Sequence, residues 1–84
     1  MRLKDMKRGD SATVVGIGGR DMVKKRILDL GITKGCKIKM VRIAPLGDPV
    51  ELELRGYRLT IRMSDAEFVE IDDITPESPG DDSR

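Results

Sequence analysis

The 84-residue sequence contains no histidine and no tryptophan, and only one tyrosine, one phenylalanine and one cysteine. The absence of histidine removes the commonest general base and the commonest metal ligand. Because Cys36 is alone, no disulfide can form within the chain, which favours a reducing compartment. No apolar run approaches the roughly 20 residues of a membrane span, and no signal peptide follows the charged N-terminal residues. We therefore expect a cytoplasmic protein.

The shortage of aromatic residues also narrows the classes of ligand. Single-stranded nucleic acids stack on aromatic side chains, and proline-rich peptides need an aromatic-lined groove. Tyr57 and Phe68 are too few for either kind of site. The basic run at residues 24–26 is interpreted as a solvated helix face, so no nucleic-acid partner is expected.

The pattern of reactive residues points away from catalysis. Cys36 alternates with Ile38 and has no base partner, which indicates a core cysteine rather than a nucleophile. The glycines at 16–19 precede a helix, but Asp21 occupies the position of the last glycine of a dinucleotide fingerprint. The carboxylates show no ligand spacing. We expect no catalytic residue, no cofactor and no metal site, and hence no enzyme.

Charge is distributed unevenly along the chain. Residues 72–84 carry five acidic residues and one arginine, a formal charge of −4, whereas residues 1–71 carry +5. The tail composition cannot bury enough apolar surface to fold. We expect one domain over residues 1–71 and an acidic, disordered tail over residues 72–84.

Strand patterns dominate what the sequence does contain. Five strands are predicted, at residues 12–17, 36–43, 50–55, 58–63 and 68–71. In the second strand the apolar alternation changes phase, which predicts a β-bulge at Met40 to Arg42. The next two strands form a hairpin with a Gly56-Tyr57 type II′ turn, which would place Glu51 opposite Arg62. Ser64 to Glu67 has a capping-box pattern and predicts one helical turn.

One helix is predicted over residues 21–30, with Val23, Ile27 and Leu30 as its apolar stripe. Gly31 in a left-handed conformation would end it, with Ile32 in the accompanying hydrophobic contact. This helix lies between the first and second strands. We predict a mainly β fold with one short helix, a small five-stranded SH3-like barrel, in preference to an OB-fold.

Three apolar residues fall outside the predicted core. Met22 and Leu28 flank the helix stripe, and Leu46 lies at the tip of the APLGDP loop at residues 44–49. Single exposed apolar residues are normal, but a group of them marks a docking surface. Together with the neighbouring Lys25 and Arg26, they are the candidate partner-binding residues.

Several of these motifs occur together in one known family. They are LKDMKRGDSATVVGI, then RILDLGI, a Thr-Lys-Gly turn, MVRIAPLGDPVELELRGYRLTIR and SDAEFVEI. In this order and spacing the chain resembles the ferrous iron transport protein A family, FeoA, over residues 1 to about 71. The resemblance implies an SH3-like barrel and a cytoplasmic accessory role in bacterial ferrous iron uptake. It also implies that the partner is the GTP-binding domain of the membrane transporter FeoB, and it supplies no catalytic site.

Other functions remain open at this point. Arg20 or Arg26 could act in trans on a GTPase. Related barrels form the C-terminal domain of iron-dependent repressors, so a metal-responsive regulatory module is an alternative, as is direct Fe²⁺ binding. A homo-oligomer is also open, because the strand at 36–43 could offer an edge.

Overall fold

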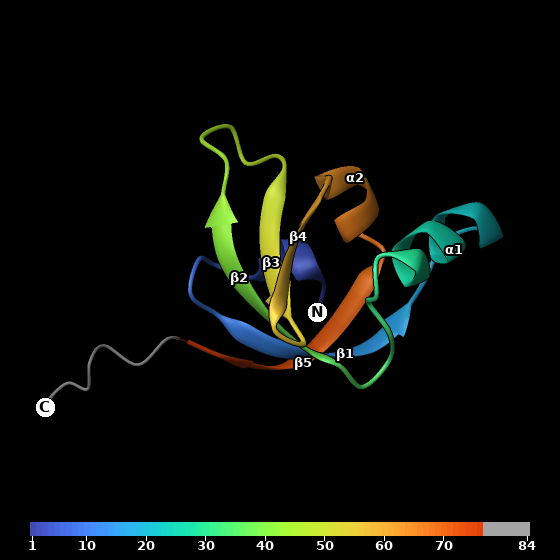
Figure 1. Cartoon of the computed structure of the whole chain (residues 1–84), viewed down its shortest axis with the longest axis horizontal. Helices are drawn as coiled ribbons and strands as arrows, with labels where there is room; N and C mark the ends of the chain where they lie inside the picture. Colours follow the sequence, from blue (N-terminus) through green and yellow to red (C-terminus); the bar gives the residue numbers. More distant parts are fainter. Residues whose placement is uncertain (77–84) are drawn as a thin grey trace, which may run out of the picture.

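The computed structural model describes residues 1–76. After a short 3₁₀ turn, η1 (Leu3–Asp5), the elements are β1 (Ser11–Ile17), α1 (Asp21–Asp29), β2 (Lys37–Ile43), β3 (Val50–Leu54), β4 (Tyr57–Ile61), α2 (Met63–Ala66) and β5 (Val69–Thr75). The strands form one antiparallel sheet in the order β4-β3-β2-β1-β5. In Figure 1, β1 and β5 run along the bottom while β2, β3 and β4 stand upright, so the sheet bends around one core. The prediction of five strands, with the helix between the first two, is confirmed.

Buried and exposed residues alternate along the strands, and the buried ones form the core. On β2, Ile38 and Met40 are buried, whereas Lys37 and Lys39, which alternate with them, are exposed. The register of β2 against β3 shifts between Met40 and Arg42, which confirms the predicted bulge. The N-terminal segment also contributes, because Leu3 and Met6 are buried against the same cluster. Because of the bulge, apolar side chains of β2 can face the core on both sides of the bend.

The β3–β4 hairpin has a different register from the one predicted. Its loop is Arg55-Gly56, not Gly56-Tyr57, and both loop residues have positive φ angles, 50° and 83°. Left-handed conformations at both positions define a type I′ turn, for which glycine suits the second position. Glu51 therefore faces Thr60 rather than Arg62. The shift is two residues, so every side chain keeps its predicted face.

The helical turn at Met63–Ala66 also differs from its predicted form. The capping box expected at Ser64 is wrong, because the residue before α2 is Arg62 and its side chain makes no cap. The cap comes instead from the β2–β3 loop, where Asp48 Oδ1 accepts a hydrogen bond of 2.7 Å from the Met63 N–H. The APLGDP loop thus has a structural role at its base, although Leu46 at its tip is exposed.

Removal of this cap gives a first prediction. Asp48→Ala should lower the free energy of unfolding by about 1 kcal/mol, because a helix N–H loses its acceptor. Asp48→Asn keeps an acceptor oxygen and serves as the matched control. Urea unfolding followed by circular dichroism measures both variants, and equal losses in the two would contradict the capping role.

Strand β5 is longer than predicted. It continues from Val69 to Thr75, so residues 72–75, which were assigned to the tail, lie in the sheet. Thr75 pairs with Ser11 at the end of the β1–β5 ladder. The disordered tail predicted from the composition otherwise falls on residues 77–84, outside the described residues.

Candidate functional site

One side of helix α1 packs against the core, and the other side faces outward. Ile27 is fully buried, and Val23 and Leu30 pack partly buried against the core. Gly31 has a φ of 98°, and its N–H donates to the Leu28 carbonyl over 2.9 Å, as the predicted glycine stop requires. Ile32 is buried behind it. The predicted stripe and stop are confirmed, and they turn the opposite face of α1 outward.

The end of α1 is also fixed from the β3–β4 hairpin. The Tyr57 hydroxyl donates a 2.7 Å hydrogen bond to the Leu30 carbonyl. A Cβ atom at Gly31 would overlap that hydroxyl. Beside it, Arg55 Nη2 donates to Thr33 Oγ1 over 2.8 Å. These contacts join segments more than 20 residues apart, so no local pattern in the sequence could predict them.

The outward face of α1 contains a hollow of about 510 Å³. We call it the α1 hollow, and it is lined by Met22, Lys25, Arg26, Asp29 and Leu30. Met22 is 82% exposed, an unusual exposure for a long apolar side chain. Arg26 Nη2 lies 3.3 Å from Asp65 Oδ1, an ion pair that ties α1 to α2. The hollow therefore combines an accessible methionine with two basic side chains, Lys25 and Arg26, and one carboxylate, Asp29.

The five predicted docking residues do not form one patch. Met22, Lys25 and Arg26 line the α1 hollow. Leu28 is 43% exposed but lies outside that lining. Leu46 is 96% exposed on the β2–β3 loop, which lies on the opposite side of the molecule from α1 in Figure 1. The structure thus separates a helix surface from a loop tip.

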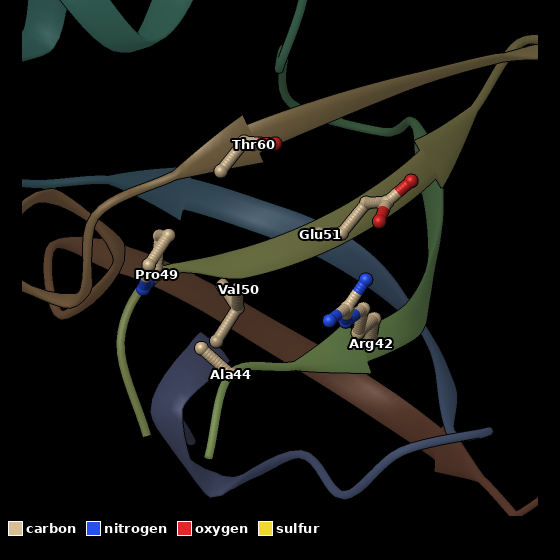
Figure 2. Close-up of a pocket in the computed structure, with 6 residues that line it drawn as sticks. All are labelled: Arg42, Ala44, Pro49, Val50, Glu51 and Thr60. Carbon is tan, nitrogen blue, oxygen red and sulfur yellow. The ribbon is translucent and has the colours of Figure 1, made fainter. Parts of the chain in front are cut away.

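A second concavity, which the sequence did not indicate, lies at the base of the β2–β3 loop. It has a volume of about 220 Å³ and is lined by Arg42, Ala44, Pro49, Val50, Glu51 and Thr60. Figure 2 shows Arg42 and Glu51 extending from neighbouring strands into the same space. Because their charges oppose each other, the pocket presents no single sign of charge to a ligand.

Within residues 1–76, no cluster of potential metal ligands is present. No group of three or more histidine, cysteine, aspartate or glutamate side chains is placed to hold a metal ion there. Cys36 is buried, as expected of a core cysteine. No helix among the described residues is long and apolar enough to cross a membrane. What the described surface does contain is the α1 hollow, with an exposed methionine beside two basic side chains.

Comparison with known proteins gives the family. The model of the FeoA domain matches residues 1–73. The chain belongs to the FeoA domain family. A fusion protein of Fe²⁺ transport protein A with the Fe²⁺ transporter FeoB from Porphyromonas gingivalis is 39% identical over 72 residues, which are 86% of this chain but only 8% of that relative. The family resemblance expected from the motifs is confirmed.

Solved structures agree with the assignment to FeoA. The FeoA-like protein of Clostridium acetobutylicum is 35% identical, with a TM-score of 0.81 over 86% of this chain and 84% of that one. Stenotrophomonas maltophilia FeoA in complex with zinc is 29% identical, with a TM-score of 0.73 over 86% and 89% of the two chains. That protein is described as an SH3 domain protein, so the predicted SH3-like fold is confirmed.

A regulatory relative shares the fold. A manganese-dependent transcriptional repressor is 14% identical, with a TM-score of 0.77 over 84% of this chain and 39% of the repressor. At that identity the likeness concerns the barrel alone. The comparisons thus show membership of the FeoA domain family and a shared fold.

Proposed function

We propose that this chain is a cytoplasmic accessory protein of ferrous iron uptake that binds and regulates the GTP-binding domain of a FeoB-type transporter. The observation that carries the proposal is the fusion relative, in which a FeoA part and FeoB belong to one polypeptide. A covalent fusion raises the effective concentration of two modules that act together. This chain would make the same association with a FeoB-type transporter.

The α1 hollow is the contact surface that we propose. Met22 offers an exposed apolar anchor, and Lys25 and Arg26 supply positive charge beside it. Buried apolar anchors carry most interface energy, while rim charges steer association. The complementary partner surface is an apolar recess bordered by carboxylates. Because α1 is braced by the core, by Tyr57 and by Asp65, the surface needs little ordering on binding.

A binding titration tests this proposal. The full chain is titrated against the isolated GTP-binding domain of the cognate transporter, in the GDP-bound and GTP-analogue-bound states. Met22→Asp should weaken binding at least about tenfold, as expected for an anchor residue. Leu46→Asp is the matched comparison, since it replaces an even more exposed apolar residue on the far loop, and it should bind like the wild type. Absence of micromolar association in both nucleotide states would rule out the proposed partner.

Two further measurements test two other functions. Stimulated GTP hydrolysis that is lost in Arg20→Ala would indicate an arginine supplied in trans. The zinc complex of Stenotrophomonas maltophilia FeoA supports a metal-responsive module as the second candidate. Anaerobic Fe²⁺ titration of the free chain tests that role, because stoichiometric binding without transporter contact would favour it over docking.

A further inference from the structure

One transverse row of residues crosses all five strands on the outer face of the sheet. The cross-strand pairs are Arg58 with Glu53, Glu53 with Lys39, Lys39 with Ser11, and Ser11 with Thr75. Directly opposed residues in a sheet share a face. Thr75 at the end of β5 therefore lies on the same face as the cations of β2 and β4, only two strands away from Lys39.

Three shallow hollows run along this face and share lining residues. Their volumes are about 150, 200 and 270 Å³. The first shares Ser11 and Lys37 with the second, and the second shares Lys39 and Glu53 with the third. We call this continuous surface the outer-sheet groove. It begins at Thr75 and ends at Arg58.

The charge of the outer-sheet groove is mostly positive. Its lining contains five basic residues and two acidic ones: Arg8, Lys37, Lys39, Arg55 and Arg58 against Glu53 and Asp73. Arg58 contacts Glu51 and Glu53 only at 3.9 and 3.8 Å, near the limit of an ion pair. Its guanidinium thus keeps donors for a further anion.

The sequence that follows β5 has the opposite charge. Residues 77–84 contain Glu77, Asp81 and Asp82 against Arg84 alone. We propose that this acidic segment docks in the outer-sheet groove, with its carboxylates against the cations of β2 and β4. The occupant is thus a named part of the same chain, and the contact is independent of any transporter.

The spacing suits this occupant. Neighbouring strands lie about 4.8 Å apart, so Lys39 is about 10 Å and Arg58 about 19 Å from Thr75 across the sheet. Eight extended residues span at most about 26 to 29 Å, enough to reach the far end of the groove. Tethering next to the groove also gives the segment an effective concentration that a separate acidic partner lacks. Each exposed ion pair is weak, so the contact depends on salt.

Paramagnetic relaxation in the full chain tests the proposal. A nitroxide is attached at Ser83→Cys in a Cys36→Ala background, and amide intensities are compared at about 0.01 M and 1 M salt, where the Debye lengths are about 30 and 3 Å. At low salt, the amides of Lys37, Lys39 and Arg58 should lose intensity selectively. The loss should disappear at high salt and in the variant with Glu77→Gln, Asp81→Asn and Asp82→Asn.

A control at carboxylates outside the tail keeps the experiment specific. Asp21→Asn with Asp29→Asn removes two carboxylates from α1 and should leave the broadening unchanged. A second measurement needs no cysteine substitution: the amide shifts of Lys37, Lys39 and Arg58 should differ at low salt between the wild type and the neutralised tail. Broadening that is unaffected by the tail charges, or shifts that are identical in the two proteins, would overturn the proposal.

Discussion

Gly31→Ala should lower the free energy of unfolding by about 3 kcal/mol, because two costs add at this position. The φ angle of 98° is in the left-handed region, where a side chain costs about 1–2 kcal/mol. The new methyl group would also displace the Tyr57 hydroxyl from the Leu30 carbonyl, at about 1 kcal/mol for the lost hydrogen bond. Urea unfolding followed by circular dichroism measures the sum.

Gly35→Ala separates the two costs. Gly35 has a similar φ of 93°, but a Cβ atom there meets nothing within 4 Å. It should show the backbone cost alone, about 1–2 kcal/mol. Tyr57→Phe removes the hydroxyl, so Gly31→Ala should cost less in that background than in the wild type. Equal losses for Gly31→Ala and Gly35→Ala would mean that the Tyr57 contact carries no energy.

Ile27→Ala should destabilise the domain by about 2–5 kcal/mol, as expected when a fully buried isoleucine leaves a cavity. The loss is large for this chain, because a folded part of this size has a total stability of roughly 4–11 kcal/mol. Ile27 is also the buried residue of α1 itself. Its loss should therefore loosen the helix and weaken partner binding even though Met22 is unchanged. Unfolding and binding titrations on the same variant report the two effects.

Leu28→Ala is the matched control for Ile27→Ala. The two residues are adjacent in α1, have similar volume and lose the same number of carbon atoms, but Leu28 is exposed. Its replacement should change stability by no more than about 0.5 kcal/mol. A loss comparable to that of Ile27→Ala would mean that Leu28 also packs against the barrel, contrary to its exposure in the structure.

Features set by neighbouring residues were predictable from the sequence. The stop at Gly31 follows from one glycine after an apolar stripe, and the bulge near Val41 follows from a change of alternation within one strand. Exposure of Met22 follows from its angle on the helix wheel. In each case the information lies within about ten residues, because the backbone geometry is local.

The hairpin register shows where local reasoning fails. Gly56 fits the first position of a type II′ turn and the second position of a type I′ turn equally well. The choice depends on Arg55, which adopts a φ of 50° and bonds to Thr33 in a distant turn. The observed turn thus occurs together with a long-range contact that no local pattern contains.

The candidate site likewise has features that the sequence predicted and features that it did not. Helix periodicity placed Met22, Lys25 and Arg26 on the outside of α1, and the structure joins them in one hollow. Periodicity could not show that Leu46 lies on another side of the molecule, nor that Asp48 reaches across to α2. Those facts depend on where the β2–β3 loop lies relative to α1 and α2, which involves residues far apart in the chain.

Because Tyr57 contacts the end of α1, its intrinsic fluorescence can report on that helix. Tyr57 is the only tyrosine, and no tryptophan is present, so it dominates the intrinsic fluorescence of the chain. Its hydroxyl bonds directly to the carbonyl at the end of the helix that bears the α1 hollow. The fluorescence emission of Tyr57 therefore depends on how the helix packs on the barrel. Changes in that packing can be observed without an added dye.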